Sequence, residues 1–251
     1  MSMSTRNFAR TNKGPVDFRL EAPSAQVNVS TSPNLTEAAV AINGPAEVVD
    51  HVKEQSFGGS WIIKLPEDAG TTIVARTGNS TSFSATNVSS GTVIVGGNVT
   101  INGRQVSGGT TINPEPIIVT VVLPEGSDLR TRVKNGEVNA SGSYTVVDHQ
   151  SSNASLYVQS AHRVEADTSN GNLVIAKASE EVDVHTSNGK VRVGASAPHT
   201  DVRTSNGSVE VDAAGDHQIS ARTSNGSVTV YRNGHNPILQ TRTSNGQERV
   251  L

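Results

Sequence analysis

The sequence predicts an all-β protein that forms a single elongated, parallel β-solenoid of about 18 residues per coil. The first observation is a tetrapeptide, Thr-Ser-Asn-Gly, that recurs at nearly constant spacing. The second is an alternation of apolar residues on both sides of it, with the period of two that β-strands have. The third is an aromatic content of only 3%, which disfavours a bulky globular core. The tetrapeptide occurs five times, at residues 168–171, 186–189, 204–207, 223–226 and 243–246.

The spacing of the tetrapeptide predicts stacked coils. Successive copies start 18, 18, 19 and 20 residues apart, a short and regular period that is typical of solenoids. Crossover connections between parallel strands are right-handed in nearly all proteins, so we expect a right-handed coil.

Two apolar columns follow each turn. The residues three and five positions after the turn asparagine are small and β-branched or aliphatic, and those between them are polar or variable. This is strand alternation, so each coil should contain a strand, a Ser-Asn-Gly corner and a second strand. The inward residues after the corner are Leu173, Val191, Val209 and Val228, followed by Ile175, Val193, Val211 and Val230.

The corner asparagines should form a ladder along the stack. An amide side chain carries both donors and an acceptor, and asparagine ladders stabilise stacked strands about 4.8 Å apart. The following glycine is expected to supply a backbone conformation that other residues adopt only at a cost. The preceding threonines, at 168, 186, 204, 223 and 243, are expected to form a second ladder. The structural corner ladder comprises Asn135, Asn153, Asn170, Asn188, Asn206, Asn225 and Asn245.

The rest of the chain divides into three parts by regularity. Residues 1–14 are polar and are expected to be a disordered tail. Residues 15–128 are expected to form irregular early coils, with Val93, Val95, Val99 and Ile101 alternating between glycine corners, and 129–251 the regular repeats continuous with them. Residues 35–58 carry weak helical periodicity and could be a cap or an insertion.

Composition excludes several classes of protein. The chain has no cysteine, so it has no disulfide framework, thiolate metal site or thiol nucleophile. No apolar run resembles a signal peptide or a membrane span, which predicts a cytoplasmic protein. The net charge of −3 and the scarcity of aromatics argue against nucleic-acid binding.

Two surface patches are candidate sites. Three histidines at 18-residue spacing could bind a transition metal or act as a pH-sensitive patch, although a repeating polar loop alone explains their spacing. Three arginines three positions before the corner, with Arg132 as a further member, could bind a polyanion, but Asp183 and Asp201 in the neighbouring column can pair with them. The patches are His199, His217 and His235, and Arg203, Arg222 and Arg242.

No residue pattern indicates catalysis, a cofactor or a metal. Carboxylates that a β-helix polysaccharide-cleaving enzyme would need, such as Asp183, Asp201, Glu165 and Glu210, look scattered along the repeat. We therefore expect a non-enzymatic structural or binding protein, with an unknown protein or glycan partner. A polysaccharide-active enzyme of the β-helix type is the alternative.

The last stretch, "QERVL", suggests a device against end-to-end stacking. Glu248 stands where earlier coils have Val228 and Val209, and a charge near an edge strand blocks edge-to-edge pairing. We expect a monomer or a weak end-to-end dimer.

The segment "VTVVLPEGSDLRTRVKNGEVNASG" and the coils "V-x-T-S-N-G-x-V-x-V" after it resemble the bacterial β-strand-repeat family named "putative adhesin". The resemblance covers roughly residues 60 to 251, and a weaker one extends to bactofilins. It implies a β-solenoid, a rigid scaffold or adhesin-like module, and no established reaction, cofactor or catalytic residue.

Overall fold

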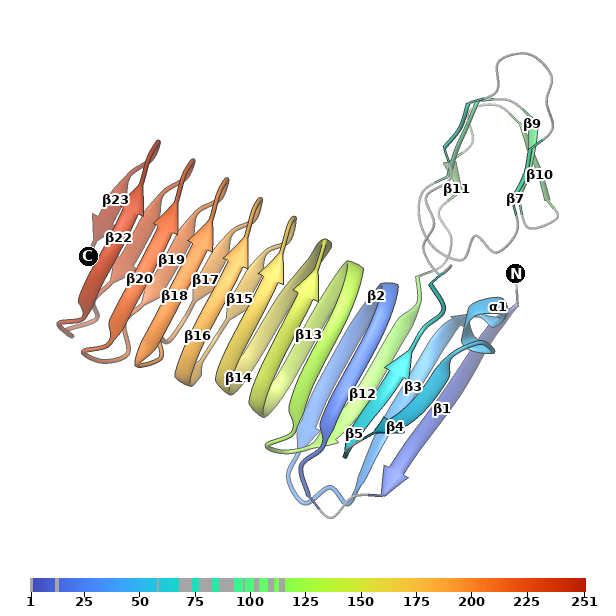
Figure 1. Cartoon of the computed structure of the whole chain (residues 1–251), viewed down its shortest axis with the longest axis horizontal. Helices are drawn as coiled ribbons and strands as arrows, with labels where there is room; N and C mark the ends of the chain where they lie inside the picture. The colour runs from blue at the N-terminus through green and yellow to red at the C-terminus, as the bar shows by residue number, and fades with distance from the viewer. Residues whose placement is uncertain are drawn as a thin grey trace.

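The computed structural model describes residues 2–11, 14–57, 59–67 and 116–251, together with the backbone of six short strands between 74 and 112. The main body is one mixed sheet of seventeen strands laid side by side along the long axis of the molecule (Figure 1). Its strands are β1 (Met3–Thr11), β2 (Asp17–Ser32), β3 (Glu37–Pro45), β4 (Lys53–Phe57), β5 (Ser60–Lys64), β12 (Ile118–Pro124), β13 (Asp128–Ser151), β14 (Asn153–Thr168), β15 (Leu173–Ile175), β16 (Ala178–Thr186), β17 (Val191–Val193), β18 (His199–Thr204), β19 (Val209–Asp212), β20 (Gln218–Thr223), β21 (Val228–Tyr231), β22 (Ile238–Thr243) and β23 (Glu248–Val250).

Two further sheets of three strands each lie between residues 74 and 112. The first contains β6 (Val74–Arg76), β8 (Val93–Gly96) and β11 (Thr111–Ile112), and the second contains β7 (Phe83–Ala85), β9 (Asn98–Ile101) and β10 (Arg104–Ser107). Each combines one parallel and one antiparallel pairing. The side-chain alternation expected in this segment lies outside the described residues.

The prediction of a single parallel β-solenoid is wrong, because the N-terminal part of the sheet contains antiparallel strands. β3 pairs antiparallel with both β1 and β12, and β4 pairs antiparallel with β5. The result is a mixed sheet that is not closed. The corner repeat that predicts parallel stacking is absent from residues 1–67, so it could not define the direction of these strands.

The first 58 residues differ from expectation in detail as well. The segment 1–14, expected to be a disordered tail, includes β1, which is hydrogen-bonded along its whole length to β3. The segment 35–58 contains β3, the four-residue helix α1 (Ala46–Val49) and β4, so it contributes strands to the sheet. In the described part of the chain no helix is long and apolar enough to cross a membrane. The division of the chain at 128/129 stays a prediction.

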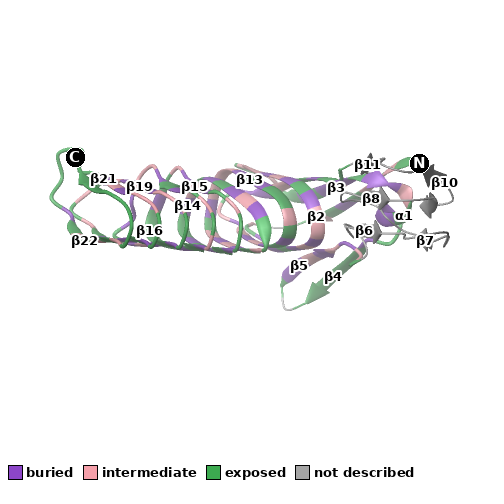
Figure 2. Cartoon of the chain, turned by 90° about the horizontal axis from the view of Figure 1, so that it is seen from above, coloured by how far each residue is buried: buried purple, intermediate pink, exposed green. Residues whose placement is uncertain are grey.

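From Asp128 onward every pairing is parallel. Strands that precede a corner pair with one another, as in β16, β18, β20 and β22, and strands that follow a corner do the same, as in β17, β19, β21 and β23. Figure 2 shows these two sets as two walls. The long strands β2, β13 and β14 run through both walls and join them into one sheet.

The core lies between the walls and consists of the inward columns. Val191, Val209 and Val228 are adjacent in register and fully buried. On the opposite wall Val184 and Val202 are also fully buried and adjacent. Buried and exposed residues alternate along the strands (Figure 2), which is the period-two pattern of a strand with one face in a core.

The corner asparagines form a continuous hydrogen-bonded column. Each side-chain Nδ2 donates to the Oδ1 of the asparagine one coil earlier, at 2.7–2.8 Å. The first member, Asn135, donates instead to the backbone oxygen of Pro23 at 3.2 Å. All seven amides therefore point in one direction along the stack.

The threonines and glycines beside this column act differently from expectation. The threonine hydroxyls make no ladder of their own. Those of Thr223 and Thr243 donate to the carbonyl oxygens of Gly207 and Gly226 one coil earlier, at 2.9 and 2.8 Å. The glycines of the five Thr-Ser-Asn-Gly corners do not have a positive φ, whereas Gly136, after the first corner asparagine, has a φ of 134°. Gly207 is required because a Cβ atom there would overlap the carbonyl oxygen of Gly189.

We expect Val209→Asp to unfold the coils around it. The substitution would place a carboxylate between Val191 and Val228, where no partner or water can reach it, at a cost of about 4 kcal/mol or more. Urea denaturation followed by circular dichroism measures the loss. Thr229→Asp, on the outward side of β21, is the matched control and should change stability little. Equal stability of Val209→Asp and wild type would contradict the inward assignment.

We expect Asn206→Ala to cost about 1–2 kcal/mol, because it removes two hydrogen bonds but leaves groups that water can reach. Asn206 donates to Asn188 and accepts from Asn225. Ser205→Ala, next to the column but outside it, is the control. If both variants melt at the temperature of wild type, the ladder does not contribute to stability.

We expect His149 to make the fold sensitive to acid. Its side chain is fully buried, and Nδ1 lies 2.8 Å from the hydroxyl of Thr131. Burial lowers its pKa from 6.5 to about 4. The unfolded chain therefore binds a proton more readily than the folded chain, and stability that is complete above pH 6.5 is lost as the pH falls from 6.5 towards 4.

Thermal melts across this pH window test the role of His149. The free energy of unfolding of wild type should fall more steeply with decreasing pH than that of His149→Ala. Alanine is chosen because Ala166 occupies the register position next to His149 on β14. Parallel pH profiles for the two proteins would show that another group causes the acid sensitivity.

Candidate functional site

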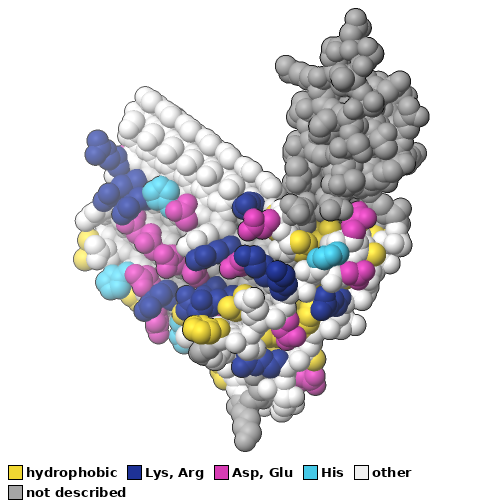
Figure 3. Space-filling view, turned by 45° about the vertical axis from the view of Figure 1, so that its right-hand side comes forward, with side chains coloured by type: hydrophobic (Ala, Val, Ile, Leu, Met, Phe, Trp, Pro, Cys, Tyr) yellow, Lys and Arg dark blue, Asp and Glu magenta, His cyan; other side chains and the backbone are white. Residues whose placement is uncertain are grey.

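One wall of the sheet carries most of the aligned charges. We call it the charged face: the outward side chains three, five and seven positions before the corner asparagines, on β13, β14, β16, β18, β20 and β22. Figure 3 shows Lys, Arg, Asp and Glu side chains gathered on the face in view, beside a band that has none. The alternation of the strands turns these side chains outward, because the residues between them belong to the core.

A column of four carboxylates runs along the middle of the charged face. Asp148, Glu165, Asp183 and Asp201 occupy successive register positions on four adjacent strands. They are therefore aligned, not scattered as their sequence positions suggest. Like charges directly opposite one another on neighbouring strands repel, so the column concentrates negative potential that can attract a basic group.

Arginines lie at both ends of the carboxylate column. Arg130 forms an ion pair with Asp148 at 3.6 Å, and Arg203 pairs with Asp201. Arg203, Arg222 and Arg242 are neighbours in register, so the structure brings these three together. Arg132 lies far from them, opposite Glu21 on β2.

A groove of about 280 Å³ lies where the acidic and basic parts of the charged face meet. Glu181, Asp183 and Asp201 line one part of it, and Gln218, Ser220, Arg222 and Gln240 line another. Arg222 donates to Gln240 at 3.2 Å, which holds both side chains across the strand boundary. The groove presents both signs of charge and neutral amides at strand spacing.

The three histidines do not form a column. His199 lies between Glu181 and Gln218 in register. His217 precedes β20, and its Nδ1 lies 3.1 Å from the Ser196 hydroxyl. His235 lies in a turn, where its backbone nitrogen donates to the carbonyl oxygen of Arg232 at 2.9 Å. Among the described residues no three histidine or acidic side chains gather in a way that could hold a metal ion.

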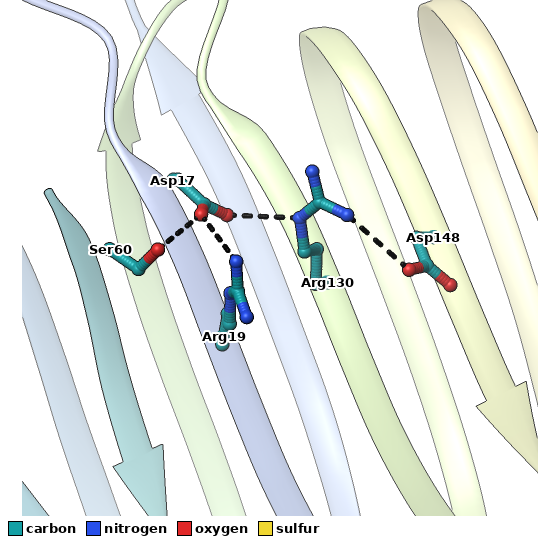
Figure 4. A network of polar contacts seen from close by, with 5 residues as sticks. All are labelled: Asp17, Arg19, Ser60, Arg130 and Asp148. Atoms are coloured by element: carbon teal, nitrogen blue, oxygen red, sulfur yellow. Dashed lines mark hydrogen bonds and ion pairs between the residues drawn. The ribbon is translucent and has the colours of Figure 1, made fainter. Parts of the chain in front are cut away.

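At the N-terminal end of the charged face, a polar network joins three strands (Figure 4). Asp17 on β2 accepts hydrogen bonds from Ser60 on β5, from Arg19 at 3.0 Å and from Arg130 on β13 at 3.1 Å. Burial alone would raise the pKa of Asp17, but the bonds from Ser60, Arg19 and Arg130 outweigh it and the pKa lies below its usual value. The network fastens β5 and β13 to β2 and fixes one end of the face.

Sequence reasoning missed Asp148 and the Asp17 network. Asp148 lies five positions before Asn153, the same offset that places Asp183 before Asn188, so extending the column upstream would have found it. Asp17, Arg19 and Ser60 lie in strands without a corner asparagine. No signal in the repeat points to them.

Two other carboxylates lie apart from the charged face. Glu210 is on the opposite wall, where Lys190 at 2.7 Å and Arg192 at 3.9 Å pair with it. Glu248 folds back onto the last coil and accepts hydrogen bonds from the Thr243 backbone nitrogen at 2.9 Å and the Thr241 hydroxyl at 3.0 Å. Whether Glu248 keeps the protein monomeric stays a prediction.

Comparisons with known proteins identify structures of similar fold but do not establish a function. No family model matches the chain, and no curated protein is similar to it in sequence. A solved structure described as a putative adhesin from Bacteroides fragilis is similar over 100% of this chain and 97% of its own, with a TM-score of 0.56 and 12% identity. Another putative adhesin, from Parabacteroides merdae, is similar over 99% of this chain and 96% of its own, with a TM-score of 0.54 and 10% identity. The chain therefore shares the all-β fold of these bacterial proteins, and the resemblance to bactofilins is not supported.

Proposed function

We propose that this protein is a non-enzymatic, adhesin-like binding module that holds an extended protein or glycan partner along its charged face. The observation that carries the proposal is the alignment of like side chains at successive register positions, with a groove where the carboxylate and arginine columns meet. A partner that repeats along its length can contact several coils at once. Many weak contacts then add up, as they do in multivalent binding.

The rigidity of the sheet supports a binding role. The face is built on strands whose inward residues are buried, apart from those of the last strand β22, which are partly buried. Its side chains are therefore presented in fixed positions and lose little freedom when a partner binds. The two structures of similar fold are described as putative adhesins, which agrees with such a role. A cytoplasmic location stays a prediction that cell fractionation can check.

The carboxylate column keeps one alternative open, a polysaccharide-active enzyme. Glu165, Asp183 and Asp201 lie side by side, and paired carboxylates are the catalytic groups of most glycosidases. The groove on the charged face, however, is lined only by side chains of adjacent strands in its described part, and no loop there encloses a substrate. We therefore favour the binding proposal. Cleavage of a polysaccharide by the protein would distinguish the enzyme from the binding module.

The test uses the full chain as bait in extracts of the host cell, followed by affinity measurement with the captured partner. The double variant Asp183→Asn with Asp201→Asn should weaken binding at least about tenfold, and raising the salt from about 50 to about 500 mM should weaken wild-type binding, because charges at an exposed face are screened. The matched control is Glu210→Gln with Asp212→Asn, the same charge change on the opposite wall, which should bind like wild type.

Incubation with polysaccharides, followed by measurement of new reducing ends, separates the alternatives. We expect no products. Products formed by wild type and lost in the Asp183→Asn, Asp201→Asn variant would establish the enzyme instead, and equal binding by the two double variants would place the partner on another surface.

A further inference from the structure

A second groove lies on the opposite wall, just after the corners of β13, β14 and β15. Its volume is about 580 Å³, within the range of small-molecule sites. Tyr157, with 38% of its surface exposed, lies in its centre. In register, Asn139 on β13 and Val174 on β15 flank the tyrosine. The other polar lining residues used below are Glu137, Ser155 and Asn172.

Hydrogen bonds fix Ser155 and Asn172 in this groove and leave further donors available. The side-chain oxygen of Asn172 accepts from the Lys190 backbone nitrogen at 2.9 Å, which leaves its NH₂ group to donate. The Ser155 hydroxyl accepts from the Asn172 backbone nitrogen at 3.2 Å, which leaves its own hydrogen to donate. Within the described residues, the Tyr157 hydroxyl and the Asn139 amide have no hydrogen-bond partner. The groove is therefore pre-organised with free donors and acceptors.

The electrostatics of the groove favour a neutral ligand. Its lining contains one charged side chain, Glu137, and no cation. Arg192, which lies beside Val174 in register, and Lys190 are both ion-paired with Glu210. An anionic ligand would find no counter-charge, and a cationic one would find a single exposed carboxylate, which is worth little.

We propose that this groove binds a neutral glycan. A pyranose ring has an apolar C–H face, which suits the ring of Tyr157 and the side chain of Val174, and an edge of hydroxyls that both donate and accept. Those hydroxyls match the amides of Asn139 and Asn172, the Ser155 hydroxyl and the carboxylate of Glu137. The groove opens beside the corner column at Asn135, Asn153 and Asn170, whose exposed amides can contact further sugars of the same chain.

This site is distinct from the charged face, and its test is separate. The full chain is applied to an array of neutral oligosaccharides, with sialylated and uronic-acid glycans and peptides as comparison ligands. The affinity of the strongest neutral oligosaccharide is then measured by titration calorimetry. We expect wild type to bind neutral oligosaccharides, and any binding of the charged ligands or the peptides to be unaffected by substitution of Tyr157.

The tyrosine variants test the position of the site. Tyr157→Ala should bind at least about tenfold more weakly, since it removes the aromatic contact, whereas Tyr157→Phe keeps the ring and should lose less than about threefold. Tyr231→Ala is the matched control, because Tyr231 has a similar exposed fraction of 37% on the same wall. Circular dichroism checks that each variant is folded.

Four results would overturn the inference. The first is binding of no neutral oligosaccharide on the array. The second is binding of acidic glycans or peptides that Tyr157→Ala weakens, which would place a charged ligand in this groove. The third is an equal loss of affinity in Tyr157→Ala and Tyr231→Ala. A loss confined to the Asp183→Asn, Asp201→Asn variant would likewise assign the glycan to the charged face and not to this groove.

Discussion

The in-register parallel pairing of successive coils is the constraint on which the structure from Asp128 onward depends. When two parallel strands pair without a shift, each residue lies beside its counterpart one coil away, about 4.8 Å distant. Side chains that interact well with copies of themselves are then favoured at every position. Valines fill the inward columns and asparagines the corner. A one-residue slip would turn the valines outward and the charges inward, so the register is fixed by the core as much as by the backbone.

The same constraint produces the surfaces. An outward position that is repeated from coil to coil forms a column of side chains. Where the residues are of one type, the column presents the same chemical group several times along the stack. Carboxylates and arginines on one wall give a charged face. On the other wall, the residues around Tyr157 are uncharged except for Glu137, and the groove there is lined mainly by neutral polar groups. Because both walls share one core, the two surfaces are held rigidly with respect to each other over the coils that carry them.

Sequence reasoning reached the regular half of the chain and failed in the irregular half for a physical reason. The offsets from the corner asparagine identified Val191, Val209 and Val228 as inward residues and aligned Arg203, Arg222 and Arg242, because a repeat carries its own register. Strand direction before residue 128 depends on contacts between segments distant in sequence, such as β3 with β1 and β12, and no local pattern encodes those contacts. The histidines show the opposite error. Equal spacing in sequence did not give equal register, because Val211 and Ile219 are eight positions apart, whereas their register partners Val193 and Thr200 are seven positions apart.

The anchoring of the corner column at Pro23 has a consequence for the order of all seven amides. A side-chain amide can sit in such a column in two orientations, and turning one of them around would set two NH₂ groups or two oxygens face to face. The orientations are therefore coupled, and the column behaves as a one-dimensional ordered array with only two uniform states. The backbone oxygen of Pro23 can only accept a hydrogen bond, so it selects the state in which Asn135 donates to it. One carbonyl group on β2 thus determines the direction of amides as far away as Asn245, more than a hundred residues later in the chain.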